Sequence, residues 1–391
     1  MAAYLWKAPD PRDLPEWRAQ VRDDVGSNDS LRSLTQAINA GHNAIFPAAS
    51  SMEPLPGATA SMLMARAEEH RLCAAKLYYA TADMTSLALA AASTPPTEPI
   101  RKTRLPSPYG FMVFAEPIGN YTHDIAAVPS HPRPACDGAH VTVTTPIVAI
   151  SWGLWAAADT DFANGSTVRW FNQRSARSQL EPIPQDFEGV WITFYAPPGS
   201  AFDTLAPDTV IDSLSGGAPV TAADIQLYPR HAPLTWENET VLAFGKTFDD
   251  LMPDITRQCS QVVYTAWQLM SQTGRAQLTE VNELPRDRAG RKRDRRDGII
   301  GPSDVQILNV HTAHRLSPPE QDAAAPTGRR APQWSCRWPV RPYRRNTCLN
   351  PRAHAEGACE HEERIVPAHI KGPNDKPLRS GETVHLWDHQ P

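Results

Sequence analysis

The chain has 391 residues, of which 41% are hydrophobic and 21% charged, and it contains 38 prolines. This composition excludes a fibrous or intrinsically disordered chain and predicts two or three globular domains with short elements and stiff loops. The net charge of −5 divides unevenly: residues 1–285 carry 19 Lys and Arg against 30 Asp and Glu (−11), and residues 286–391 carry 19 against 13 (+6). Either the basic region binds an acidic partner, or the two regions attract each other within the fold.

The sequence also indicates a compartment. No window approaches the roughly 18 apolar residues that cross a bilayer, and the N-terminus reaches prolines and acidic residues before any apolar segment of a secretory signal. Six dispersed cysteines do not form a disulfide framework. We therefore expect a cytoplasmic protein without membrane contacts.

Residues 1–100 are predicted to form a helical N-terminal region. Asp29 or Ser30 is a candidate N-cap for a first helix. The alanine-rich run 60–93 predicts one long helix, which ends at the paired prolines Pro95 and Pro96 because proline cannot continue a helix.

Residues 105–285 are predicted to form a mixed, mostly antiparallel sheet closed by an amphipathic helix. Runs rich in β-branched and aromatic residues predict the strands, among them Val141–Trp155 and Val190–Tyr195. Apolar residues at helical spacing within 248–273 predict the closing helix. With the helical N-terminal region, this pattern favours the α+β class.

The last part of the chain is predicted to consist of a basic linker, residues 286–300, and a small β-rich module, residues 301–391. The linker has seven basic residues and no apolar stripe, which indicates a solvated link or the polar end of the preceding helix. Residues 305–310 predict a strand, and the low-complexity run 317–333 predicts a flexible connector.

The densest group of binding-type residues lies in WSCRWPVRPYRRNTCLNPR, residues 334–352. Arg and Lys hold phosphates, and exposed bases stack on aromatic rings and guanidinium planes. We predict contacts to DNA or RNA from a tail set that comprises Arg337, Trp338, Arg341, Tyr343, Arg344, Arg345, Asn346, His369 and Lys371. Residues 286–296 would add an electrostatic arm. The alternative is that the aromatic rings face a core and the arginines are merely solvated, with arginine (31) exceeding lysine (7) through coding bias.

The same region contains weak candidates for zinc ligands, namely Cys336, Cys348, Cys359 and His361. Structural zinc sites usually use knuckles of the C-x2–4-C type, whereas the gaps between these cysteines are eleven and ten residues. Reduced, partly buried thiols are the favoured interpretation, and we predict no cofactor.

Catalytic signatures are sparse. The sequence has no P-loop, no G-x-G-x-x-G, no G-x-S-x-G and no H-E-x-x-H. Glu362, His369 and Lys371 have the side chains that a metal-dependent nuclease uses for acid–base chemistry and phosphate binding. A polar loop followed by a Gly-Pro turn explains them more simply, so an enzyme is not the favoured prediction.

The tail resembles one in a family of uncharacterised actinobacterial proteins met on phages, plasmids and other mobile elements. In these, an R-W-x-V-x-x-x-W-R-N cassette precedes a P-x-H-x-K-G-P-x-x-x-P-L ending. The matching positions are Arg337, Trp338, Val340, Arg345, Asn346, Pro367, His369, Lys371, Gly372, Pro373, Pro377 and Leu378. Arg344 replaces the second aromatic residue, and the connection between the two motifs is longer than usual. The resemblance implies a mobile-element context and no particular activity.

We therefore expect an accessory protein that binds nucleic acid through its basic C-terminal module. The first alternative is an antitoxin-like or adaptor subunit that binds another protein through the acidic N-terminal body. The second is the nuclease described above.

Overall fold

The computed structural model describes most of the first 310 residues and parts of the tail. The described residues are 6–39, 44–48, 57–94, 97–124, 142–157, 167–172, 179–184, 186–203, 205–213, 219–226, 232–250, 255–272, 278–310, 337–340, 343–348, 361–366, 369–373 and 376. Among them, no helix has both the length and the apolar character needed to cross a bilayer.

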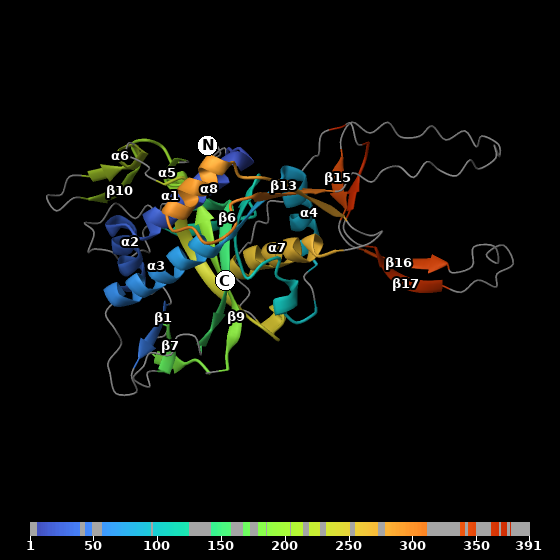
Figure 1. The fold of residues 1–391 in the computed structure, drawn as a ribbon, viewed down its shortest axis with the longest axis horizontal. Coiled ribbons are helices and arrows are strands. Elements are labelled where there is room, and N and C mark those ends of the chain that lie inside the picture. Colours follow the sequence, from blue (N-terminus) through green and yellow to red (C-terminus); the bar gives the residue numbers. More distant parts are fainter. Residues whose placement is uncertain are drawn as a thin grey trace.

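A seven-stranded mixed sheet forms the centre of the molecule (Figure 1). Its strands, in spatial order, are β12 (Thr235–Ala243), β9 (Glu188–Ala196), β6 (Ala149–Ala156), β3 (Tyr109–Phe114), β2 (Lys76–Ala80), β14 (Val305–Val310) and β13 (Thr279–Leu284). Only the pairings of β2 with β3 and β14 are parallel. The α+β class and the mostly antiparallel sheet are therefore confirmed.

Helices cover both faces of this sheet, because its central strands bury side chains on both sides. Tyr78 and Met112 pack on one face with α4 (Ala82–Ala92) and α7 (Ile255–Met270). Their chain neighbours Leu77 and Phe111 pack on the other face with α1 (Leu14–Val25) and α3 (Gly57–Ala74). This alternation is the period-two pattern of a strand, and it places a hydrophobic core on each side of the sheet.

The N-terminal region is not purely helical. The run predicted as one long helix is α3 and α4 separated by β2, a central strand of the sheet. Parallel pairing with β3 and β14 holds these five residues as a strand, although alanine-rich helices flank them on both sides. Helix α2 (Asn28–Asn39) begins earlier than predicted, and its cap is Ser27, whose Oγ accepts a hydrogen bond from the Ser30 amide at 3.2 Å.

The central strands and closing helix follow the prediction with two changes. The run Val141–Trp155 is two strands, β5 (Thr142–Ile147) and β6, separated by Val148. Within the range predicted for the closing helix, the described residues form a 3-10 turn at Phe248–Asp250 and helix α7.

Smaller sheets and helices surround the central layers. They are β1 (Ala44–Ala48) with β7 (Thr167–Asn172) and β8 (Gln179–Pro182), β4 (Gly119–Asp124) with β5, and β10 (Val210–Ser213) with β11 (Pro219–Thr221). Among the described residues, the remaining short helices are α5 (Ser200–Asp203), α6 (Ala222–Gln226) and the 3-10 turns Pro11–Asp13 and Lys102–Arg104.

The predicted domain boundaries differ from the structure at the C-terminal side. Strand β14, which we assigned to the C-terminal module, lies in the central sheet beside β2. The predicted linker 286–300 contains helix α8 (Arg288–Arg296). The tail forms two small antiparallel pairs, β15 (Trp338–Val340) with β18 (His369–Lys371) and β16 (Tyr343–Cys348) with β17 (His361–Val366). The predicted connector 317–333 lies outside the described residues.

Candidate nucleic-acid interface

Helix α8 is defined at both ends by capping residues. The Asp287 carboxylate accepts a hydrogen bond from the Gly290 amide at 2.7 Å and so caps the N-terminus. After the last turn, Gly298 adopts φ of 75°, and the Ile299 amide donates to the Asp294 carbonyl at 2.9 Å. This ending needs a residue with positive φ, which glycine adopts without strain. The nine residues Arg288–Arg296 are therefore a regular helix with defined ends.

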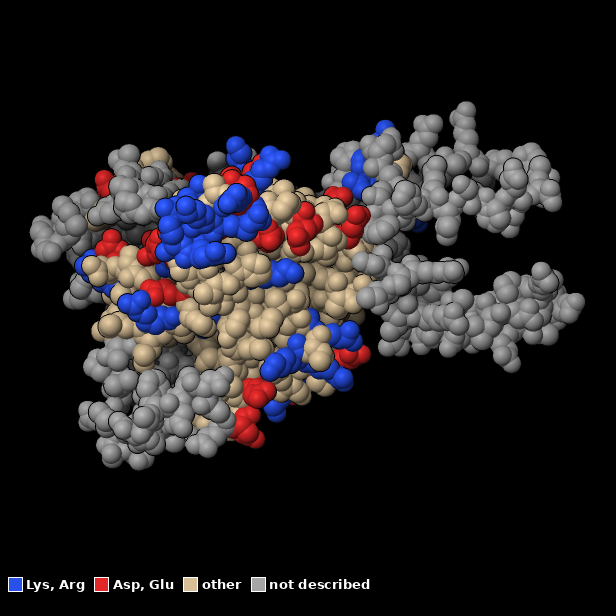
Figure 2. Space-filling model, viewed as in Figure 1, with Lys and Arg blue, Asp and Glu red and all other residues tan. Residues whose placement is uncertain are grey.

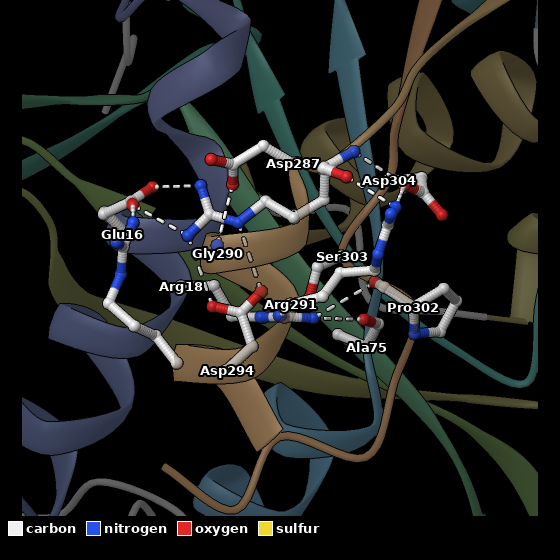
Figure 3. Close-up of polar contacts among 12 residues, drawn as sticks. Glu16, Arg18, Ala75, Asp287, Gly290, Arg291, Asp294, Pro302, Ser303 and Asp304 are labelled. Atoms are coloured by element: carbon white, nitrogen blue, oxygen red, sulfur yellow. Dashed lines mark hydrogen bonds and ion pairs between the residues drawn. The ribbon is translucent and has the colours of Figure 1, made fainter. Parts of the chain in front are cut away.

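A charged clamp fixes the inner side of α8 to helix α1 (Figure 3). The Arg286 guanidinium donates to both carboxylate oxygens of Glu16, at 3.0 and 2.7 Å, and to Asp294 at 3.2 Å. Burial disfavours the charge of Arg286, but the hydrogen bonds that it donates to the two carboxylates outweigh this effect and raise its pKa. Gly290 and Asp294 are the buried residues of the helix. The inner side is thus held by polar contacts instead of an apolar stripe.

A second arginine anchors α1 beneath this clamp. Arg18 is fully buried and donates to the carbonyls of Ala75 at 2.8 Å and Pro302 at 3.3 Å, and to the Ser303 hydroxyl at 2.9 Å. Burial lowers the pKa of Arg18 to about 10. These contacts tie α1 to the start of β2 and to the segment that leads from α8 into β14.

The outer side of α8 is strongly basic. Arg288, Lys292, Arg295 and Arg296, here called the outer row, are exposed. Figure 2 shows Lys and Arg side chains gathered over this helix. Each residue of an α-helix advances by about 100°, so the outer row is centred opposite Asp294 and Gly290. The helix therefore separates its charges, with the compensated ones inside and the outer row outside.

The ion pairs at the flanks of α8 are longer than those on its inner side. At its flanks, Arg293 lies 3.4 Å from Glu16 and Arg291 lies 3.7 Å from Asp304. None of the outer row has an ion-pair or side-chain hydrogen-bond partner among the residues that the structure describes. Like charges four residues apart destabilise a helix by about 0.2–0.5 kcal/mol per pair. Arg288, Lys292 and Arg296 form two such pairs, so an anionic ligand would relieve their repulsion.

The structure describes only part of the predicted tail set. Arg337 is already engaged: its guanidinium donates to the Lys376 carbonyl at 2.9 Å and to the Asp83 carboxylate on α4 at 3.2 Å. Trp338 is half-buried in β15, and Lys371 is exposed at the end of β18. Tyr343, Arg344, Arg345 and Asn346 belong to β16 and His369 to β18, whereas Arg341 lies outside the described residues. The contact of Arg337 with Asp83 shows that this arginine docks the tail onto the body.

The backbone pairs the two motifs of the tail with each other. Trp338 is the register partner of Lys371, and Val340 is the partner of His369. The first part of the cassette and the downstream ending therefore form one small antiparallel ladder, whereas Arg345 and Asn346 lie in β16, which pairs with β17.

Three of the residues considered for metal binding or nuclease chemistry lie in the second tail pair. Cys348, the last residue of β16, and His361, the first residue of β17, are register partners, and Glu362 follows in β17. Cys336 and Cys359 lie outside the described residues. Within the described part of the chain, no three His, Cys, Asp or Glu residues are grouped so as to hold a metal ion.

A second charged cluster, which the sequence did not suggest, lies in the core between α3 and the sheet. The buried Glu68 carboxylate pairs with Arg71 at 2.6 Å and accepts hydrogen bonds from the Thr193 hydroxyl at 2.7 Å and from the hydroxyls of Ser151 and Tyr195. Burial alone would raise the pKa of Glu68, but Arg71 and the three hydroxyl donors lower it below its usual value. The Glu68 carboxylate is thus charged and satisfied within the fold.

Arg71 completes this cluster by packing between aromatic and backbone surfaces. Its guanidinium lies 4.9 Å from the centroid of the Trp191 ring, a cation–π contact. A Cβ atom added at Gly153 would come within 2.8 Å of the Arg71 side chain, so glycine is required there for close approach. The cluster fastens α3 to strands β6 and β9 and has the properties of a structural ion pair.

No protein-family model, curated protein or solved structure matches the chain. The candidate interface therefore depends on its own geometry and charge.

Proposed function

We propose that this protein binds nucleic acid and that the outer row of α8 contacts the phosphates. The observation that supports this proposal best is the set of four exposed cations without partners among the described residues, on a helix whose inward charges are compensated. Phosphate contacts by Arg and Lys release condensed counterions and supply most of the affinity of non-specific nucleic-acid binding.

The proposal moves the principal interface from the tail to α8. Arg337 is engaged with Asp83, so we assign it to docking the tail. The other members of the tail set remain candidates for additional contacts. In this proposal the protein acts in the cytoplasm as an accessory protein of a mobile element, the context that the tail cassette implies.

The test is a binding titration with a charge-reversal variant and a matched control. A labelled nucleic acid is titrated with the wild type, with Lys292→Glu/Arg296→Glu, and with Arg101→Glu/Lys102→Glu. The control changes the net charge equally, at two exposed cations at the start of the 3-10 turn Lys102–Arg104. We expect the α8 variant to lose at least tenfold in affinity at 50 mM salt and the control to lose much less.

Other outcomes would reject or redirect the proposal. Equal losses in both variants would mean that only net charge matters and that α8 is not the interface. No affinity of the wild type at low salt would reject nucleic-acid binding. In that case, a stoichiometric protein partner that co-purifies with the chain would favour the adaptor alternative.

A further inference from the structure

We infer that the ligand of α8 is a nucleic-acid duplex, held through its phosphates without selection for base sequence. This inference rests on the proposed function and specifies its ligand class. It follows from the exposed cations of α8, from the lack of aromatic side chains in this segment and from the contacts that hold the helix on the body.

First, the segment that contains α8 lacks aromatic side chains. Proteins that bind single strands combine basic grooves with aromatic side chains on which the bases stack, and each stacked base contributes about 1–3 kcal/mol. Residues 286–300 contain no aromatic side chain. The arginines of the outer row are therefore not accompanied, within this segment, by the aromatic rings that hold unstacked bases, which favours phosphate contacts.

Second, α8 is held against the body on its inner side. A recognition helix enters the major groove, which is about 12 Å wide, and reads base edges there. An α-helix with its side chains is about 10–12 Å across, so the side that enters the groove must stand clear of its own protein. Here Gly290 and Asp294 are buried, Arg286 binds Glu16, and the Ile300 amide donates to the Cys73 carbonyl at 3.0 Å. Because its inner side is held in this way, α8 is placed to lie along a phosphate backbone, which favours phosphate contacts over base readout.

Third, the higher density of phosphate charges on a duplex favours a duplex over a single strand. From Arg288 to Arg296 the helix rises by about 12 Å, at 1.5 Å per residue. A duplex presents one phosphate per about 1.7 Å of its axis, twice the density of one of its strands, so several phosphates lie within reach of the outer row. Four cations that neutralise phosphates give a salt slope, log Kobs against log[salt], of about −3.6 on duplex and about −2.8 on a single strand.

Fourth, helix α8 is preorganised for binding. The caps at Asp287 and Gly298 and the Arg286 clamp form α8 before any ligand arrives. The outer row buries little apolar surface on binding, and burial of apolar surface is what gives a negative heat-capacity change. We therefore expect binding with a heat-capacity change near zero and without a gain in helix content.

Anionic lipid surfaces also attract basic helices, but α8 is poorly suited to them. Interfacial helices insert an apolar face below the headgroups. The inner side of α8 is polar and packed on α1. Among the described residues next to the helix, one large apolar side chain is exposed, that of Ile300, at 70%. A membrane is therefore the less favoured partner and becomes an outcome of the test.

The experiment compares ligands of equal length with the full chain. The probes are duplexes of about 20 base pairs with A·T-rich, G·C-rich and mixed sequences, single strands of the same sequences, and vesicles with and without phosphatidylserine, each between 50 and 200 mM salt. We expect the three duplexes to bind within about threefold of one another, with a slope near −3.6 and more tightly than the single strands.

Variants connect the result to the outer row. Replacing Arg288 and Arg295 with alanine should reduce the duplex slope by about 1.8, because two phosphate contacts are lost. Replacing the same residues with lysine keeps the charge and should restore most of the slope. Circular dichroism and thermal unfolding of each variant would confirm that it is folded.

The outcomes separate this inference from the proposed function. Tighter binding of single strands, or a tenfold preference for one duplex sequence, would overturn the duplex inference while nucleic-acid binding stands. Binding to phosphatidylserine vesicles with no binding to any nucleic acid would overturn both and identify a membrane surface. No binding to any probe would also overturn both.

Discussion

The two charged clusters of this protein differ in whether their charges are paired. In the Glu68 cluster, the carboxylate and the guanidinium of Arg71 are buried together, and three hydroxyl groups satisfy the carboxylate further. In α8, the clamp of Arg286 resembles this arrangement on the inner side, but the outer row has no partner among the described residues. Compensated charge can serve the fold alone, whereas uncompensated charge of one sign costs stability and is better explained by an external ligand.

The largest expected effect comes from breaking the Glu68 cluster. Glu68→Gln keeps the shape of the side chain but leaves the Arg71 charge buried without a counter-charge, which should cost about 3–5 kcal/mol in the free energy of unfolding. Urea unfolding measures the loss. The exposed change Asp29→Asn, in the surface pair with Arg32, is the control and should cost less than about 1 kcal/mol.

The double variant Glu68→Gln/Arg71→Met tests whether the cost arises from the unpaired charge. Removing both charges should destabilise the protein less than Glu68→Gln alone, because no buried ion is left without a partner. A double variant that is less stable than the single variant would instead mean that packing of the Arg71 side chain against Trp191 dominates the cluster.

The same cluster predicts a dependence of stability on acid pH. The pKa of Glu68 is lower in the folded state than the value of about 4.3 usual for an unfolded chain. Its ionisation therefore stabilises the fold above that pH, and the contribution is lost as the pH falls through the lower, folded pKa. The difference in unfolding free energy between wild type and Glu68→Gln should shrink below about pH 4. A difference that stays constant from pH 7 to pH 3 would contradict an ionised Glu68.

A smaller effect is expected from releasing the clamp of α8. Arg286→Ala removes the hydrogen bonds to Glu16 and Asp294, and because Glu16 is partly solvated the cost should be about 1–2 kcal/mol. Hydrogen exchange should show loss of protection in the amides of α8 before any loss in the central strands. Arg286→Lys should restore only part of the protection in α8, since an ammonium cannot form the bidentate contact with Glu16. Unchanged protection in α8 would show that its caps suffice to hold it.

These comparisons also explain how far the sequence predicted the structure. The α+β class was predictable because strands such as β9 are rich in β-branched and aromatic residues and the closing helix α7 has a clear helical periodicity. Strand β2 was missed because its five residues lie between alanine-rich helices, and it is stabilised by β3 and β14, far away in the sequence. No local sequence pattern predicts pairing with strands so distant in the sequence.

The candidate interface was visible only as a charge run. Its helix was missed because its inner side is fixed by Arg286 and Glu16, which are 270 residues apart, instead of by an apolar stripe. The signals that could have found it are the two caps, Asp287 and Gly298, which enclose a run of helix-compatible residues. Glu68 gave no signal, because a glutamate within an alanine-rich helix ordinarily faces solvent.

The smallest expected effect separates an outer row kept for a ligand from one that is merely solvated. Lys292→Glu converts the repulsive pairs with Arg288 and Arg296 into attractive ones and should stabilise the protein by several tenths of a kcal/mol at low salt. The same variant should weaken duplex binding, since one phosphate contact becomes a repulsion. Thermal unfolding and the binding titration, both at 50 mM salt, measure the two effects on one sample. A gain in stability with unchanged binding would mean that Lys292 belongs to an ordinary solvated surface, whereas opposite changes in stability and affinity would show that the repulsion in α8 is retained for its ligand.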